Sequence, residues 1–472
     1  MKDTKESSRW LILLVVLLST FMSTLDGSIV NVALPKMAEV LEVTTSSVQF
    51  VATSYLIVIS GTVIIFGRLG DMIGKNKMFQ FGIAVFTLGS LLCGITSSFS
   101  MLILARVIQA IGAAGTMANS QGIITEVFPA NERGKALGLS GTAVALGSLV
   151  GPGLGGLIVG AMRWEYIFLI NVPIGLIALI LSFKLLPKSP VKAPEKMDWF
   201  GSLLFILTIV PLFVSLNEGI SLGFQHPLIV SGLILAAISF IAFIYIERKR
   251  ENPLLQLQIF QNKLFSLSIF CGFISFVSIF CNNIILPFYL QTTMSFSPQQ
   301  TGLILMIYPL ILTVVAPISG HLSDKIGSEV LTFIGLMLNS IGIGLMSTLN
   351  ETSNTLNMVI FLSFMSIGIG LFQSPNNSLI MSTVPRDKLG IAGSINALVR
   401  NLGMVCGIVL ATTLLYSQMS SKLGVRITDY VKGQDNAFLY GMKTVYLTAG
   451  FICLVGAIMT LVRLVGRKNR EN

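Results

Sequence analysis

The sequence predicts an all-α polytopic membrane protein. Of its 472 residues, 53% are apolar and only 11% are charged, whereas roughly 25% of the residues in an ordinary soluble domain are charged. The mean hydropathy is +0.83. No Asp, Glu, Lys or Arg occurs between Leu264 and Ser323. A soluble domain this apolar would be unable to cover its own surface, and its apolar content also excludes a disordered chain.

Charge clusters, Gly, Pro and Asn divide the apolar sequence into fourteen segments, each near the length of about 20 residues that a bilayer requires. The first segment follows Lys2, Lys5 and Arg9. Because it is too long for the apolar core of a signal peptide and lacks a cleavage site, we interpret it as a retained helix. The expected spans are 10–32, 47–66, 78–97, 101–123, 136–160, 165–184, 199–217, 227–246, 264–290, 300–319, 330–349, 356–381, 389–417 and 443–463.

The distribution of Lys and Arg predicts the orientation. With the N-terminus inside, the cytoplasmic ends and loops hold 23 of the 31 basic residues and the outer loops hold six. Arg106 and Arg400 lie within spans. An excess of this size follows the positive-inside rule. The net charge of +10 then reflects topology and contact with anionic membrane lipids, and no nucleic-acid partner is expected.

Two short motifs recur at the same offset of 253 residues. Gly67–Lys75 (GRLGDMIGK) returns as Gly320–Gly327 (GHLSDKIG), and the triplet RGK that starts at Arg133 returns as RDK at Arg386. Two matches at one offset indicate duplication of a six-helix unit. We therefore expect an N-terminal six-helix bundle at 1–184, linkers with two inserted transmembrane helices at 185–263, and a C-terminal six-helix bundle at 264–472. Parallel repeats of this kind are typical of transporters.

Four sequence stretches resemble motifs of the major facilitator superfamily. Gly67–Lys77 resembles its loop 2–3 motif, and Leu104–Gly112 its helix 4 motif. Gly147–Gly156 resembles the helix 5 motif of its antiporters, and Leu25–Pro35 the helix 1 motif of its 14-helix drug:proton antiporters, the EmrB/QacA type. The resemblance spans essentially the whole chain. It implies the major facilitator fold and alternating access between the two bundles.

Asp26 and Arg106 are the candidates for proton coupling. Asp26 is the only carboxylate well inside an expected span, where a charge costs about 2.5–3.5 kcal/mol. Burial favours the neutral acid and a nearby cation favours the carboxylate, so a group under both influences can load and unload a proton. Counting about 1.5 Å per residue places Arg106 at a similar depth. The alternatives are an Asp that reaches the outer headgroups and an Arg that serves only as a hydrogen-bond hub.

The loop motif combines glycines with charges. The glycines permit tight turns, and Asp71 can cap a helix or pair with a base across the loop. By resemblance the loop latches the two halves on the inner side, whereas the plainer alternative is a positive-inside turn. The residues of this expected gate are Gly67, Arg68, Gly70, Asp71, Gly74, Lys75 and, in the second copy, Asp324.

The span 136–160 contains a Gly/Pro run with small residues four apart. Pro152 removes a backbone hydrogen bond, and the glycines allow another helix to approach closely. By resemblance this run marks an antiporter, and simple helix packing is the alternative. The residues are Gly147, Gly151, Pro152, Gly155 and Gly156.

Polar side chains inside the spans are candidates for a substrate cavity, although hydrogen bonding between helices explains them about equally well. Arg400 stands out because a lone buried base needs an anion, water or carbonyl groups. The candidates are Asn31, Gln109, Asn282, Asn283, Tyr308, Phe372, Gln373, Asn376, Asn377, Asn396 and Arg400.

Motifs of other function classes are missing. The sequence contains neither a G-x-x-x-x-G-K-[ST] run nor an H-E-x-x-H, and its five cysteines all fall in apolar runs. We therefore expect no enzyme activity, no metal and no cofactor.

The sequence thus favours a proton-coupled exporter of small lipophilic drugs or toxic compounds, a function related to antibiotic resistance. The expected location is a bacterial-type plasma membrane, with both termini cytoplasmic and the chain as a monomer. Two alternatives stay open: an exporter of an endogenous metabolite or lipid on the same fold, and a non-transporting membrane sensor or scaffold.

The orientation yields the first prediction. A cysteine placed at Ser421 should react with a membrane-impermeant thiol reagent added outside cells, because Ser421 falls in the expected outer loop 418–442. A cysteine at Ser189, in the expected cytoplasmic linker, should react only after the membrane is opened. The reverse labelling pattern would show that the orientation is wrong.

Overall fold

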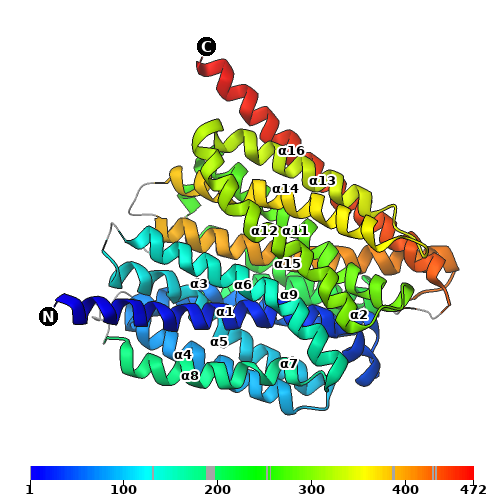
Figure 1. Cartoon of the computed structure of the whole chain (residues 1–472), viewed down its shortest axis with the longest axis horizontal. Helices are drawn as coiled ribbons and strands as arrows, with labels where there is room; N and C mark the ends of the chain where they lie inside the picture. The colour runs from blue at the N-terminus through cyan, green and yellow to red at the C-terminus, as the bar shows by residue number, and fades with distance from the viewer. Residues whose placement is uncertain are drawn as a thin grey trace. The chain divides into compact units, whose positions relative to one another are not determined.

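In the computed structural model of this chain, every regular element of the described residues is a helix (Figure 1). Within those residues, 14 helices are long and apolar enough to cross a membrane, and each overlaps one of the fourteen expected spans. The all-α polytopic fold class is confirmed. The structure describes residues 2–129, 132–187, 197–250, 254–255, 257–384, 389–427, 430 and 433–471.

The helices fall into a first half, an inserted pair and a second half along the chain. The first half contains α1 (Lys2–Val40), α2 (Thr45–Val48), α3 (Phe50–Ile73), α4 (Lys75–Ile95), α5 (Phe99–Val127), α6 (Arg133–Ala161), α7 (Tyr166–Leu169) and α8 (Asn171–Leu185). The inserted pair is α9 (Trp199–Leu222) and α10 (Pro227–Glu247). The second half contains the 3-10 helix η1 (Leu257–Gln261), α11 (Lys263–Phe288), the π-helix η2 (Tyr289–Thr293), α12 (Pro298–Ile326), α13 (Ser328–Met346), α14 (Thr355–Ser382), α15 (Leu389–Leu423) and α16 (Asp435–Glu471).

Several helices extend beyond the expected spans. Helix α1 continues through Pro35, and α15 and α16 occupy both ends of the stretch 418–442. The outer loop expected there is therefore shorter than predicted, because backbone hydrogen bonding continues into polar residues that hydropathy assigns to a loop. Ser189 and the second copy of the short RDK motif at 386–388 lie outside the described residues.

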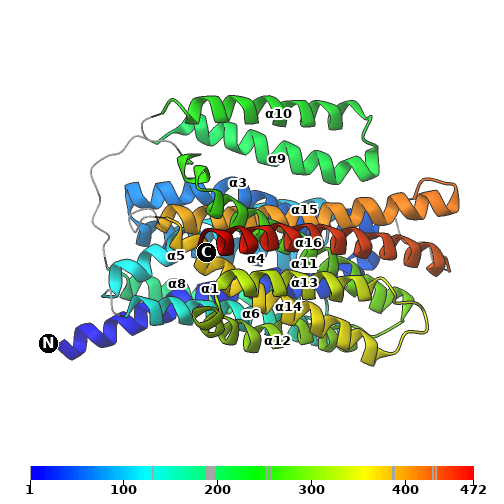
Figure 2. The same cartoon turned by 90° about the horizontal axis from the view of Figure 1, so that it is seen from above.

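The chain divides into two compact units. Unit 1 comprises Met1–Val43, Phe50–Ser215 and Val230–Leu255, and unit 2 comprises Thr44–Gln49, Leu216–Ile229 and Gln256–Asn472. Parts of the inserted pair thus belong to each unit. Within unit 1 the two inserted helices lie side by side (Figure 2), with the rings of Phe205 and Phe243 5.4 Å apart. The assignment of 185–263 as a separate part stays a prediction.

Helix packing repeats from one unit to the other. In unit 1 the helix pairs in contact include α1–α6, α3–α5, α4–α5 and α4–α8. In unit 2 they include α11–α15, α12–α14, α13–α14 and α13–α16, which are the same pairs in the same chain order. The duplication predicted from the two short motifs is confirmed at the level of packing.

The connection between the second and third spans also repeats. A single residue, Gly74, separates α3 from α4, and a single residue, Gly327, separates α12 from α13. Their φ angles are 107° and 90°, a region that side chains other than that of glycine rarely adopt. The two glycines are 253 residues apart, the offset of the repeated loop motif.

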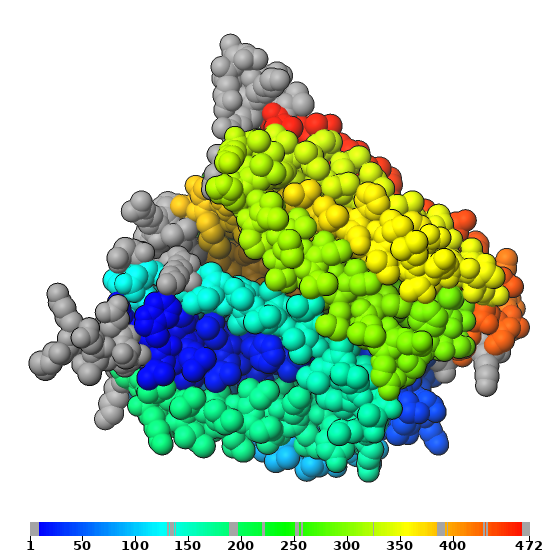
Figure 3. Space-filling model, viewed as in Figure 1, coloured from blue at the N-terminus to red at the C-terminus, as the bar shows by residue number. Residues whose placement is uncertain are grey.

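Helices α1 and α6 lie side by side (Figure 3). Glycines of α6 make the contact. A Cβ atom on Gly147 would lie 2.9 Å from the Phe21 carbonyl oxygen, and one on Gly155 would lie 3.0 Å from the Ile29 carbonyl oxygen. The hydroxyl of Ser28 donates to the carbonyl of Gly147 across this contact, at 3.0 Å. The Gly/Pro run therefore brings two backbones together, with Pro152 inside a continuous helix.

Gly151 tests this close packing. A leucine at Gly151 would overlap the side chain and backbone of α1 around Ser28, so Gly151→Leu should lower the melting temperature and abolish transport. Gly151→Ala should be milder than Gly151→Leu, because rotation of Ser28 removes its hydroxyl from the contact and a small shift of α1 relieves the remaining 2.8 Å approach to the Ser28 Cβ atom. The readouts are thermal unfolding in detergent and transport in vesicles.

Gly141 provides the matched control in the same helix. A Cβ atom on Gly141 would meet no heavy atom within 4 Å, so Gly141→Leu should fold and transport normally. Equal losses in Gly141→Leu and Gly151→Leu would show that the α1 contact does not set the requirement for glycine.

Candidate functional site

Asp26 and Arg106 form an ion pair inside unit 1. The Arg106 Nη1 atom donates to Asp26 Oδ2 at 2.6 Å. The side chain of Asp26 is 0% exposed and that of Arg106 is 1% exposed. The approach of these two residues, expected from their depth, is confirmed, and burial of both charges makes the pair a stronger interaction than a surface salt bridge.

Two amide side chains complete the hydrogen bonding of the carboxylate. Asp26 Oδ1 accepts from Gln109 Nε2 at 2.8 Å and from Asn171 Nδ2 at 2.9 Å. Gln109 Nε2 also donates to the hydroxyl of Ser90 at 2.8 Å. Gln109, expected in the substrate cavity, is instead fully buried in this network. The two oxygens of Asp26 thus accept from three side-chain donors.

Arg106 has partners besides the carboxylate. Its Nε donates to the Val51 carbonyl at 2.9 Å, and Nη1 also donates to Gln109 Oε1 at 2.6 Å. The guanidinium carbon lies 4.2 Å from the centre of the Tyr55 ring and 5.5 Å from that of Phe168. These contacts hold the guanidinium through a carbonyl, an amide and two ring faces, so its position does not depend on Asp26 alone.

Sequence reasoning missed four members of this network. Asn171 carried a usable signal, since it is an amide within the apolar span 165–184. Ser90, Tyr55 and Phe168 carried none, because a small hydroxyl and aromatic rings are common in membrane helices and only the fold directs them toward one charge.

Unit 2 lacks this pair at the equivalent positions. Gly403 of α15 packs on the Phe273 carbonyl of α11 in the same way as Gly147 of α6 packs on the Phe21 carbonyl of α1. When α1 and α11 are aligned on these two contacts, Ser278 stands at the position of Asp26. Ser278 accepts from Asn339 Nδ2 at 3.0 Å. The backbone contact of Gly335 with Gly368 matches that of Gly82 with Gly112, which places Leu362 at the position of Arg106. At these equivalent positions, the buried ion pair is therefore present in unit 1 and absent from unit 2.

The expected gating loop forms a surface cluster of charges. Lys75 Nζ lies 2.6 Å from Glu126 Oε1 and 3.4 Å from Asp71 Oδ1. Of the two roles considered for Asp71, pairing across the loop is observed, and Gly74 stands at the N-cap of α4. The remaining residues of the gate lie in α3 and α12, with the side chain of Asp324 outside the described set: Gly67, Arg68, Gly70 and Asp324.

Gly70 shows why the loop motif requires small residues. A Cβ atom on Gly70 would overlap the amide group of Asn119 in α5. Asn119 in turn donates to the carbonyls of Phe66 at 3.3 Å and of Gly115 at 2.9 Å. The end of α3 is thereby held against α5 beside the charged cluster. Asn119 and Glu126 were not singled out in the sequence, since neither belongs to the motif itself.

The polar candidates of unit 2 separate into distinct contacts. Tyr446 Oη donates to Asn282 Oδ1 at 3.2 Å, Asn376 donates to the Ser268 carbonyl at 3.0 Å, and Asn396 donates to Asn377 Oδ1 at 3.1 Å. Among the candidates whose side chains the structure describes, three buried atoms in this region have no hydrogen-bond partner, namely Tyr308 Oη, Asn376 Oδ1 and Arg400 Nε. Asn283 and Gln373 are half-buried, and Asn31 in unit 1 is buried.

Phe372 does not line a cavity. Its side chain is 1% exposed and packs with Cys271, Leu336 and Ala457 in a core cluster of unit 2. The reason is the close approach of α13 and α14, where a Cβ atom on Gly335 would lie 2.9 Å from that of Phe372. The expectation from aromatic character was wrong at this position.

Comparisons with known proteins agree with this architecture. The sequence profile described as Major Facilitator Superfamily matches residues 16–260 and 268–472. The chain is 34% identical to the riboflavin transporter RibZ of Clostridioides difficile, over 96% of this chain and 97% of RibZ. It is 29% identical to the multidrug resistance protein Stp of Mycobacterium tuberculosis, over 86% of this chain and 76% of Stp. The fold resembles that of the Escherichia coli xylose transporter XylE, with a TM-score of 0.64 and 15% identity over 96% of this chain and 97% of XylE.

Asp71 tests the loop cluster. Asp71→Asn should leave folding and membrane level near normal, because Asp71 is exposed and Lys75 keeps its shorter contact with Glu126. We expect slower transport, since the change alters a conformational equilibrium rather than a binding contact. The measurements are membrane level and initial transport rate. Transport at the wild-type rate would leave Asp71 as an ordinary turn residue.

Proposed function

Because the chain belongs to the major facilitator superfamily, we propose that it is a secondary transporter that exports small lipophilic drugs or toxic compounds in exchange for protons. Membership of this family makes the chain a membrane transporter and not an enzyme. The observation that carries the finer proposal is the ion pair of Asp26 and Arg106, a protonatable carboxyl group sealed from solvent beside a fixed cation.

The contacts suggest how the pair exchanges a proton. Three donors stabilise the Asp26 carboxylate in the closed network, so this state releases a proton. Helices α5 and α8 supply these donors, and a movement of α1 away from either removes at least one of them. Asp26 would then bind a proton, because a buried carboxyl group with fewer donors is more stable when neutral. The coupling is a proposal about this movement.

Arg106 can remain in place during such a step. With Asp26 protonated, the guanidinium retains the Val51 carbonyl, the Gln109 oxygen and the Tyr55 ring. The cost of leaving a buried cation without a carboxylate is therefore reduced. Each proton that moves inward supplies about 2.3 kcal/mol per 100 mV of membrane potential.

The direction and substrate class rest on the relatives and on the Gly/Pro run of α6. The relative Stp is named a multidrug resistance protein, and a Bacillus subtilis relative that is 29% identical over 89% of this chain is named Multidrug resistance protein 3. We propose a bacterial-type plasma membrane as the location, with both termini cytoplasmic. Protons, a lipophilic substrate and membrane lipids are the proposed partners of a monomer.

Transport of an endogenous metabolite is a second candidate. The observation that favours it is the 34% identity with a riboflavin transporter over 96% of this chain. A lipophilic cationic dye and riboflavin, supplied separately to proteoliposomes under the same imposed pH gradient, distinguish the two candidates. Movement of neither, in protein shown to be folded, would favour the sensor or scaffold alternative.

Asp26→Asn tests the proton-coupling proposal. The variant should fold, because Asn has the same shape and its single amide oxygen keeps either the bond from Arg106 or the bonds from Gln109 and Asn171. It can also retain substrate binding. Accumulation driven by a pH gradient should fall to the background of empty vesicles, since Asn does not titrate. Asp26→Glu should keep part of the activity. The measurement is substrate accumulation in proteoliposomes, with thermal unfolding as the test of folding.

Two further variants sharpen the result. Arg106→Ala should also uncouple transport, and in the Asp26→Asn background it should add little further loss, as expected when two residues act as one unit. Ser278→Ala changes the equivalent buried position of unit 2 and should leave coupling intact. Undiminished proton-driven accumulation by Asp26→Asn would refute the mechanism.

A further inference from the structure

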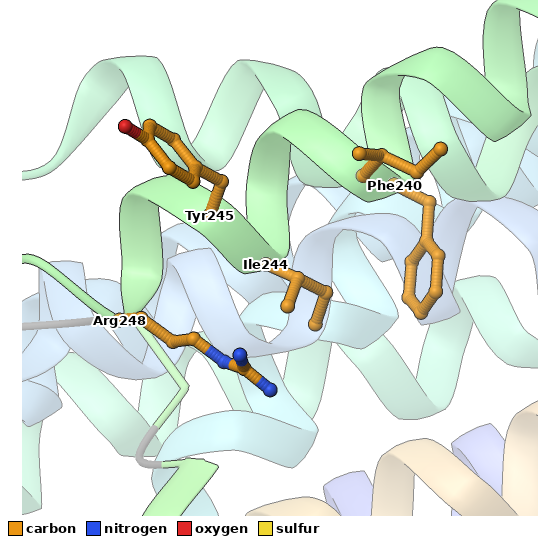
Figure 4. A pocket seen from close by; sticks show the side chains of 5 residues that line it. Phe240, Ile244, Tyr245 and Arg248 are labelled. Carbon is orange, nitrogen blue, oxygen red and sulfur yellow. The ribbon is translucent and has the colours of Figure 1, made fainter.

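Helix α10 carries an open groove on its surface near its C-terminal end. The groove has a volume of about 290 Å³ and is lined by five side chains of one helix (Figure 4). We call it the α10 groove. Its residues are Phe240, Ile241, Ile244, Tyr245 and Arg248.

The α10 groove combines an apolar row with one charge at its end. Phe240, Ile244 and Arg248 are four residues apart and project from the same side of the helix (Figure 4). At about 1.5 Å per residue the row is about 12 Å long. Phe240 is 52% exposed and Ile241 is 69% exposed, so the groove presents its apolar surface outward.

Three consecutive bases, Arg248, Lys249 and Arg250, stand at the C-terminal end of the groove, and two of them contact other side chains of the protein. The ammonium group of Lys249 lies 4.0 Å from the centre of the Tyr245 ring and also hydrogen-bonds the Tyr245 hydroxyl. Arg250 Nε lies 3.4 Å from Asp198 Oδ2. Among the described residues, the guanidinium of Arg248 has no hydrogen-bond or ion-pair partner. The cation at the end of the groove is thus available to an external anion.

Several small residues of α10 lie on a different side from the groove. A Cβ atom on Gly232 would overlap the Ser215 hydroxyl of α9, and Phe243 packs on Phe205 of α9. Ala236 is 2% exposed. Membrane helices associate mainly through small residues that let backbones approach. Because all five residues of the groove are large, this face suits flexible acyl chains better than the close approach of another helix.

We propose that the α10 groove binds an anionic phospholipid. An acyl chain lies along Phe240 and Ile244, and the headgroup phosphate binds Arg248. A headgroup without an ammonium group is preferred, since it leaves the negative charge of the phosphate uncompensated beside the guanidinium. This site is independent of the proton-coupling pair, and its test does not use transport.

Native mass spectrometry of the full-length protein in detergent tests the site. The probes are dioleoylphosphatidylglycerol and dioleoylphosphatidylcholine, which share acyl chains and differ in headgroup charge. The wild-type protein should retain the anionic lipid in preference. Arg248→Gln should weaken binding of phosphatidylglycerol about fivefold and leave phosphatidylcholine unchanged. Phe240→Ala should weaken both lipids, because it removes contact with the shared acyl chain.

Lys184→Gln is the matched control, because Lys184 is an exposed base in the last turn of α8 outside the groove. It should leave both affinities unchanged. Equal binding by Arg248→Gln and wild type, or an equal loss in Lys184→Gln, would overturn the site. A wild-type dimer that Phe240→Ala dissociates would also overturn it, since a second copy would then cover the groove. All three positions are exposed, so folded variants are expected, and thermal unfolding verifies this.

Discussion

A charge pair sealed inside an apolar helix bundle is the constraint on which unit 1 depends. Asp26 and Arg106 have almost no exposed surface, so water cannot satisfy either ion and the surrounding helices must do so. The partners come from elements distant in sequence: the Val51 carbonyl of α3, Gln109 of α5 and Asn171 of α8. Gln109 and Asn171 bind Asp26 and so hold α5 and α8 against α1, whereas the Val51 carbonyl accepts from Arg106 and holds α3 against α5. The relative positions of four helices are thereby tied to one ion pair.

The scaffold is duplicated, whereas its chemistry is not. The same helix pairs pack in both units, and glycines permit the close contacts in each. At the position of Asp26, however, unit 2 has Ser278, whose hydroxyl takes part in a neutral network with Asn339. Neutral hydrogen bonds between membrane helices contribute modestly, so they can hold unit 2 together without a protonatable group. Unit 1 therefore carries the buried ion pair, while Tyr308 Oη and Arg400 Nε of unit 2 have no hydrogen-bond partner among the described residues.

Hydropathy and spacing predicted much of this molecule because membranes impose simple rules. Fourteen apolar runs gave fourteen spans, and the rise per residue placed Asp26 and Arg106 at a similar depth. That their two helices are neighbours was implied by the family resemblance. The direction in which a side chain points around its helix was harder to predict from the sequence. Whether Phe372 turns toward a cavity or a neighbouring helix depends on how closely α13 approaches, which Gly335 decides from another part of the chain. For the same reason the sequence did not predict the contact of Asn171 with Asp26, because the position of a single amide in a span does not determine which helix it faces.

The one-residue connections at Gly74 and Gly327 have a mechanical consequence. A single residue contributes only two soft backbone torsions, and the hydrogen bonds Gly74 N to Gly70 O and Met78 N to Gly74 O continue the helical ladder on both sides. The tilt of α4 relative to α3 is therefore set by one φ and one ψ angle. No flexible loop lies between the two helices, so a displacement of the end of α3 also moves the start of α4. At each of these two connections, a small lateral displacement at the membrane surface can therefore rotate a whole helix.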